Sequence, residues 1–222
     1  MAERLAGWVW VGAAVLAGVA GIVNVVGFLG FQQHAITHLT GNTSLLAAGL
    51  VAGDARSVAG LVAMVVAFVG GAMLGGLVVQ DSTLRLGRRY GVALSIEAVL
   101  LAAAVPLFRA GHLGGPVLAA VAIGLQNAMA TTYSGALVRT SHVSGMFTDL
   151  GLMLGHALRG VPVAHRRLAL CALVIAFFFA GGVAGAMLFA VAGYDALYLP
   201  AALTGATGLG YFVYRHCVQR PA

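Results

Sequence analysis

The chain has 222 residues, of which 61% are hydrophobic and only 8% are charged, and its mean hydropathy is +0.99. A soluble domain of this composition would lack the polar surface needed to cover its core, so the composition predicts an integral membrane protein. All 12 basic residues are arginines, and they are scattered among short polar stretches. The net charge of +6 is therefore a signal of membrane topology and argues against a nucleic-acid partner.

Six apolar stretches are long enough to cross about 30 Å of hydrocarbon. The first follows residues 1–4 without a small-residue cleavage motif, so we expect it to remain as an uncleaved span. The six stretches are residues 8–30, 57–79, 89–108, 115–136, 167–191 and 195–214.

Two shorter apolar segments, 43–53 and 148–158, each follow a copy of the motif H-x-[ST]-G. The first copy runs from His38 to Gly41 and the second from His142 to Gly145. A hydroxyl residue or Asn before an apolar run is typical of a helix N-cap. At about 1.5 Å per residue these segments cross only about half of a bilayer. We therefore expect two half-helices that begin at membrane depth.

The number of spans depends on whether these half-helices cross the membrane or re-enter it. Crossing would give eight spans and would put four arginines on the side opposite Arg4. These four are Arg85, Arg88, Arg89 and Arg139. Re-entry would give six spans and leave only Arg56 and Arg109 outside. The positive-inside bias therefore favours six spans in the cell membrane, with both termini cytoplasmic.

The two halves of the chain match at further positions. Residues 21–24 (Gly-Ile-Val-Asn) resemble 124–127 (Gly-Leu-Gln-Asn), ahead of the two motifs. Repeat one (1–110) and repeat two (111–222) then each hold three spans and one half-helix, within one membrane domain. An odd number of spans inverts the second repeat relative to the first. We predict an all-α integral membrane fold of six transmembrane helices in two inverted three-helix repeats, each with a broken or re-entrant half-helix.

The residues that carry the repeat also carry a resemblance to a known family. They are Asn24, Phe28, 38–43, Asn127, 139–145 and 149–151. With them the chain resembles, over nearly its whole length, the YoaK-like family of six-span bacterial membrane proteins of unknown function. The chain has Ser141 and Ser144 where the family pattern leads us to expect Thr. The resemblance implies the number of spans and no reaction.

Two half-helix N-termini that meet inside a membrane bring unpaired N–H groups and partial positive charge to one place, which favours an anion. Arg139 would add a fixed charge there, unless it is a cytoplasmic topology residue. The imidazoles would orient a substrate or carry a proton, unless they bond the broken backbone of the opposite repeat. The expected substrate-binding residues are His38, Thr40, Gly41, Asn42, Thr43, Asn127, Arg139, His142, Ser144, Gly145 and Asp149.

Glu97 is a carboxylate within an apolar run, and such a group is either a proton relay or the buried partner of an arginine. His34 lies four residues before His38 and raises a metal site, but the second motif has no matching His, so we expect neither a metal nor a cofactor. Cys171 and Cys217 indicate no disulfide framework.

Three classes of function fit these features. A transporter or channel for a small anion or polar molecule, bound near the membrane midplane, fits best, because a symmetric duplication suits alternating access. A membrane-embedded enzyme using His38, His142 and Asp149 would lack a recognisable nucleophile and base. A helix-binding scaffold would not explain the repeated histidines. The expected partners are the lipid bilayer, a small-molecule substrate and a second copy bound through a Gly-rich span, since the 32 glycines exceed what one small bundle needs.

Overall fold

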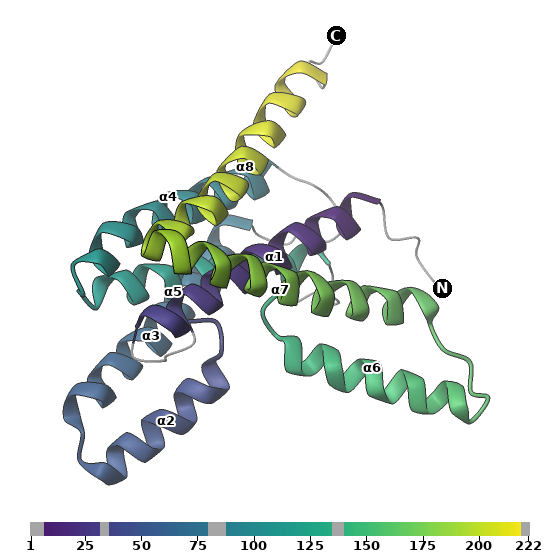
Figure 1. Cartoon of the computed structure of the whole chain (residues 1–222). Helices are drawn as coiled ribbons and strands as arrows, with labels where there is room; N and C mark the ends of the chain where they lie inside the picture. The colour runs from purple at the N-terminus through teal and green to yellow at the C-terminus, as the bar shows by residue number, and fades with distance from the viewer. Residues whose placement is uncertain (1–6, 32–35, 80–87, 135–139, 219–222) are drawn as a thin grey trace.

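The computed structural model describes residues 7–31, 36–79, 88–134 and 140–218, and every regular element in these ranges is helical (Figure 1). The predicted all-α fold is thus confirmed. The elements are α1 (Gly7–Gly30), α2 (Leu39–Ala52), α3 (Ala55–Val79), α4 (Arg88–Arg109), α5 (Gly114–Tyr133), α6 (Val143–Leu158), α7 (His165–Ala192), the 3-10 helix η1 (Gly193–Leu197) and α8 (Tyr198–Val218).

Several helices have the length and apolar character of membrane spans. Within the described ranges, four segments meet both conditions: Gly7–Gly30, Ala55–Val79, Arg89–Arg109 and His165–Gly210. The last contains α7, η1 and α8 as far as Gly210, and the chain changes direction at η1 (Figure 1). Helix α5 has 20 residues, which is long enough to cross a membrane, but Gln126 and Asn127 make it less apolar than the four segments. These helices are compatible with a multi-pass membrane protein.

Glycines let α3 and α5 pack backbone against backbone. A methyl group on Gly71 of α3 would collide with the carbonyl of Val121, and one on Gly124 of α5 would collide with the carbonyl of Phe68. Only a residue without a side chain allows two helices to approach this closely. Beside this contact lies the largest buried apolar cluster, which draws residues from α1, α3, α4, α5 and η1.

The α1 and α7 helices use glycines in the same way. A methyl group on Gly181 of α7 would collide with the backbone of Gly18, and one on Gly21 of α1 would collide with the carbonyl of Phe178. The α1–α7 pair therefore repeats the contact of the α5–α3 pair. Many glycines are thus occupied within the chain. The glycines with free space around them include Gly70, Gly76, Gly151 and Gly155. Glycines of this kind are the ones left to contact a second copy of the chain, and that contact stays a prediction.

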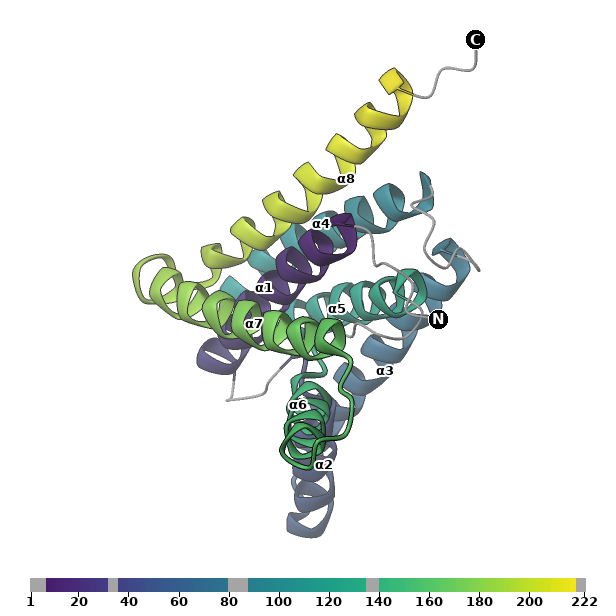
Figure 2. The ribbon, with the colours of Figure 1, turned by 90° about the vertical axis from the view of Figure 1, so that its right-hand side faces the viewer.

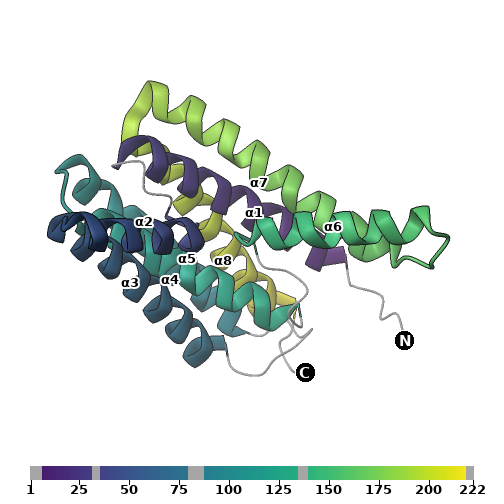
Figure 3. The same cartoon turned by 90° about the horizontal axis from the view of Figure 1, so that it is seen from below.

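Helices α2 and α6 lie along one side of the bundle, where α2 packs against α3 and α6 against α7. Their N-termini face each other, and from there the two helices diverge at an open angle, below the rest of the bundle in Figure 2 and in opposite directions in Figure 3. Because each packs mainly on one neighbour, much of their surface is exposed.

The half-helices begin earlier than the predicted 43 and 148, since α2 starts at Leu39 and α6 at Val143. Their 14 and 16 residues correspond to about 21 and 24 Å, more than half of a bilayer. The predicted capping by hydroxyls is also wrong, because His38 and His142 occupy the N-cap positions without a side-chain cap bond.

The hydroxyl groups near these helix starts bond within the helices instead. Thr43 donates to the carbonyl of Leu39 at 2.8 Å, and Thr148 donates to that of Ser144 at 3.1 Å. A hydroxyl inside a helix commonly finds the carbonyl four residues back, which satisfies it without capping.

A tight turn folds α2 back onto α3. Gly53 has a φ of 71°, a left-handed conformation that suits glycine. The carboxylate of the next residue, Asp54, accepts hydrogen bonds from the Ser57 hydroxyl at 2.6 Å and the Ser57 N–H at 3.1 Å. These bonds lower the pKa of Asp54 and cap the start of α3.

The contact of α3 with α5 leads to a testable difference between adjacent glycines. Gly71→Ala should reduce the free energy of unfolding by about 1–3 kcal/mol, because overpacking forces the backbones apart. Gly70→Ala is the matched control, since an added methyl there meets nothing within 4 Å. Thermal unfolding in detergent measures both, and equal effects of the two substitutions would contradict the proposed packing.

Candidate functional site

The two H-x-[ST]-G motifs line one cavity of about 240 Å3, between the N-termini of α2 and α6. Helices α3 and α5 supply further wall residues. The lining consists of Thr37, His38, Leu39, Thr40, Phe68, Asn127, Thr131, Ser141, His142 and Ser144. Residues from opposite halves of the chain therefore share a single site.

An asparagine of α1 fixes the chain before the first motif. The side-chain oxygen of Asn24 accepts a hydrogen bond from the Thr37 hydroxyl at 2.7 Å and from the Thr37 N–H at 3.2 Å. Thr37 is buried and directly precedes His38. Asn24 thus holds the backbone where α2 is about to begin.

Asn127 of α5 makes the corresponding contacts before the second motif. Its side-chain oxygen accepts from the Ser141 N–H at 3.3 Å, and its amide group donates to the Ser141 hydroxyl at 2.6 Å and to the carbonyl of Ile123 at 3.1 Å. Since Ser141 precedes His142, the two halves anchor their half-helices in the same manner.

Gln126 adds a contact that crosses between the halves. It is fully buried, and its amide group donates to the carbonyl of Leu16 in α1 at 2.8 Å and to the hydroxyl of Thr140 at 2.7 Å. The segment that enters α6 is therefore bonded to α5, which is bonded to α1.

Each motif glycine provides room for the histidine three residues before it. A methyl group on Gly41 would collide with the ring of His38, and one on Gly145 would collide with the ring of His142. Neither glycine is among the described glycines with positive φ. The spacing H-x-[ST]-G thus lets each imidazole lie against the first turn of its own helix. Both histidines remain exposed at the cavity.

Among the described residues, the lining of the cavity offers polar groups and no carboxylate. The N–H groups at the start of each half-helix have no acceptor within the helix, and the helix dipole adds partial positive charge. The side chains contribute hydroxyl, amide and imidazole groups. The arrangement can therefore bind a small anion or a small polar molecule.

Some expected site residues lie elsewhere. Asn42 is buried in the first turn of α2, and Thr43 is exposed on it; neither lines the cavity. Asp149 also lies outside the lining and pairs with Arg167 of α7 at 3.0 Å, which ties α6 to its neighbour. Arg139 lies outside the described residues, and its expected contact with a solute stays a prediction.

Sequence reasoning missed several wall residues, notably Thr37, Phe68, Thr131 and Ser141. The sequence did offer a signal for the anchoring of the two half-helices. Asn24 and Asn127 occupy matching positions ahead of the two motifs, and matching amide side chains there imply similar contacts. Among the described residues, no three His, Cys, Asp or Glu side chains come together as metal ligands would.

The anchoring of the second motif can be tested by Asn127→Leu. The substitution leaves the Ser141 N–H without its acceptor, so we expect a loss of about 1–3 kcal/mol in the free energy of unfolding. Thr132→Ala is the control on the same helix, because it removes only a bond to the carbonyl of Ala128 within α5. Thermal unfolding should separate the two; a similar response would mean that Asn127 does not anchor the chain.

A family model described as "Protein of unknown function (DUF1275)" matches residues 12–210. No curated protein matches the chain significantly, and neither does a solved structure. The narrower YoaK-like name remains a prediction. Because the match covers most of the 222 residues, the chain belongs to this family of unknown function.

Proposed function

We propose that the protein is a membrane transporter or channel for a small solute, bound between the N-termini of α2 and α6. The observation that carries this proposal is the cavity of about 240 Å3 that both motifs line. Irregular backbone at membrane depth is tolerated where it lines a cavity or is buried in protein. Broken helices with opposed N-termini are a common way to build a solute site in transporters.

We further propose six membrane crossings, made by α1, α3, α4, α5, α7 and α8, with α2 and α6 as re-entrant half-helices. The matching glycine contacts of the α1–α7 and α5–α3 pairs support two inverted repeats. So do the matching bonds of Asn24 and Asn127. The distribution of arginines supports cytoplasmic termini in a cell membrane, with Arg56 and Arg109 outside.

Two cysteine variants test this topology. Arg56→Cys labels the α2–α3 turn and Arg159→Cys labels the α6–α7 connection, and both positions are exposed. Native Cys171 and Cys217 would first be replaced by Ser. We expect an impermeant maleimide to reach the two sites from opposite sides of the membrane. Labelling from the same side would instead require eight crossings.

An anion is the favoured class of solute. The first-turn N–H groups and the dipoles of two helices converge, and no described residue of the lining is a carboxylate that would oppose a negative charge. A site of about 240 Å3 suits an inorganic anion or a small carboxylate. A neutral polar solute is the alternative, because hydroxyl and amide groups also line the wall.

The preference for an anion can be measured by thermal shift with sodium salts of nitrate, sulfate, phosphate, bicarbonate, formate and acetate. A bound anion stabilises the folded state in proportion to RT ln(1 + [L]/Kd), so at least one salt should raise the Tm of wild type at constant ionic strength. Gly145→Ala should abolish most of this rise, because the added methyl displaces the His142 ring.

Gly151→Ala is the control in the same helix, since its methyl meets nothing within 4 Å, and it should respond as wild type does. An anion that stabilises should then enter proteoliposomes that contain wild type faster than those that contain Gly145→Ala. If no anion stabilises wild type, or if both variants behave alike, the anion site is wrong and a neutral solute is favoured.

A further inference from the structure

Glu97 is a buried carboxyl group that the proposed solute site does not use. It lies near the middle of α4, its exposed fraction is 0%, and neither carboxyl oxygen has a hydrogen-bond partner among the described residues. An ionised carboxylate without a partner is very costly in apolar surroundings. An uncharged, protonated carboxyl avoids most of this cost.

Among the residues that the structure describes, the helices packed against α4 supply no opposite charge at this depth. They are α3, α5, α8 and η1. Helix α5 contains no Asp, Glu, Lys, Arg or His, and the only charged residue of α3 is Arg56, in its first turn. The ionisable residues of α8 are Tyr198 in its first turn and those beyond Gly210. On η1, Tyr194 and Asp195 lie at the opposite end of α4 from Tyr90.

The predicted alternative of a buried Glu–Arg pair is therefore not found in the part of the chain that the structure describes. Arg109 of the same helix pairs with Asp195 instead, and the other described ion pair joins Arg167 to Asp149. Glu97 contributes no polar contact that would hold the fold together.

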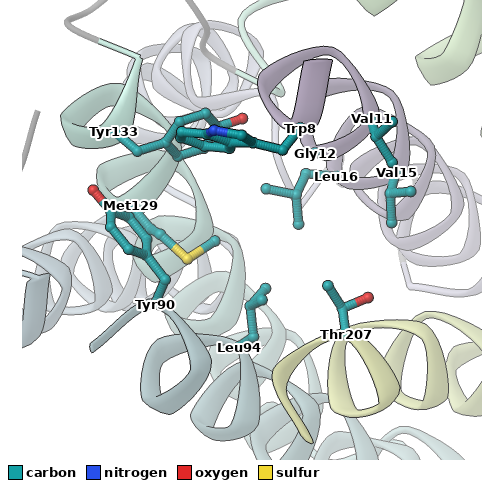
Figure 4. Close-up of a pocket in the computed structure, with 10 residues that line it drawn as sticks. All are labelled: Trp8, Val11, Gly12, Val15, Leu16, Tyr90, Leu94, Met129, Tyr133 and Thr207. Atoms are coloured by element: carbon teal, nitrogen blue, oxygen red, sulfur yellow. The ribbon is translucent and has the colours of Figure 1, made fainter. Parts of the chain in front are cut away.

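An apolar cavity of about 430 Å3 lies at one end of the bundle and reaches Leu94 of α4, three residues before Glu97, which is not itself in the lining. It lies among α1, α4, α5 and α8, and Figure 4 shows Trp8, Tyr90 and Tyr133 along one part of its wall and Leu94 along another. Positions 90, 94, 97 and 101 follow the spacing of one helix face. Glu97 thus lies one turn beyond Leu94, on the same face of α4 as two residues of the cavity wall.

The same face of α4 ends in a packed aromatic cluster. Phe108 stacks on Tyr194 with ring centroids 4.9 Å apart, and Phe31 meets Phe108 edge-on at 6.3 Å. The hydroxyl of Tyr194 donates to the carbonyl of Gly30, and the Arg109–Asp195 pair lies beside it. Glu97 therefore lies between a cavity on the Trp8 side and a closed end on the Phe108 side.

We propose that Glu97 is a proton-binding site that exchanges its proton through the cavity at the Trp8 end. The carboxyl is protonated in this conformation, and the aromatic cluster separates it from the opposite end of the bundle. That this proton is coupled to transport rests on the function proposed above. Proton binding itself does not.

Dicyclohexylcarbodiimide tests the proposal, because this apolar reagent adds to protonated carboxyl groups and forms a stable N-acylurea. Peptide mass spectrometry of the full-length protein in detergent should find the adduct on Glu97 and little on Asp149, which is half-buried and paired with Arg167. Labelling should decrease as the pH is raised, since a carboxylate does not react. Glu97→Gln should remove the adduct.

Gly12 lines the cavity beside Tyr133, so Gly12→Leu should fill it and slow the labelling of Glu97 several-fold. Gly7→Leu is the control on the same helix, because Gly7 does not line the cavity and a Cβ atom added there meets nothing within 4 Å. Glu97→Gln and Glu97→Met should leave the Tm unchanged or raise it, whereas a structural role would lower it.

The absence of an adduct at every pH would overturn the proposal, and so would a marked loss of Tm in both Glu97 variants. Equal labelling rates in Gly12→Leu and Gly7→Leu would overturn the access route. None of these measurements requires a bound anion. A failure of the anion site in the thermal-shift experiment is therefore distinguishable from a failure of this inference.

Discussion

Backbone hydrogen bonding in an apolar solvent is the constraint on which this structure depends. A helix that begins within hydrocarbon exposes N–H groups that lipid cannot satisfy. In the proposed topology the chain places two such beginnings opposite each other, and the segments leading to them are held by Asn24 and Asn127. The polar cavity is the result of this arrangement, because two incomplete helices share one small space instead of facing lipid separately.

Close packing of the remaining helices supports the half-helices. Gly71 brings α3 against α5, which carries Asn127, and Gly181 brings α7 against α1, which carries Asn24. Helices α3 and α7 in turn carry α2 and α6 on their outer sides. The site therefore depends on glycines that line no cavity, since any shift of α3 against α5 also moves α2 relative to Asn127.

The sequence predicted the parts of this structure that follow from hydropathy and duplication. Apolar length located the long helices, and the doubled motif led us to expect that His38 and His142 would be neighbours. The starts of α2 and α6 were misplaced, because hydroxyl residues look like caps in sequence even when they bond four residues back, as Thr43 does. The pairing of Asp149 with Arg167 also depends on how two helices pack, which local sequence does not specify.

The two half-helices differ in how firmly the bundle holds them. Gln126 bonds the chain before α6 to the backbone of α1, whereas the equivalent position in the first half is Val23, which cannot form such a bridge. A displacement of α1 would therefore be transmitted through Gln126 to the start of α6, while α2 is held at this level by Asn24 alone among the described contacts. In mechanical terms α1 acts on both walls of the cavity, directly through Asn24 at the α2 wall and through Gln126 at the α6 wall, so α6 is coupled to the opposite half of the bundle by a bond that Val23 cannot provide for α2.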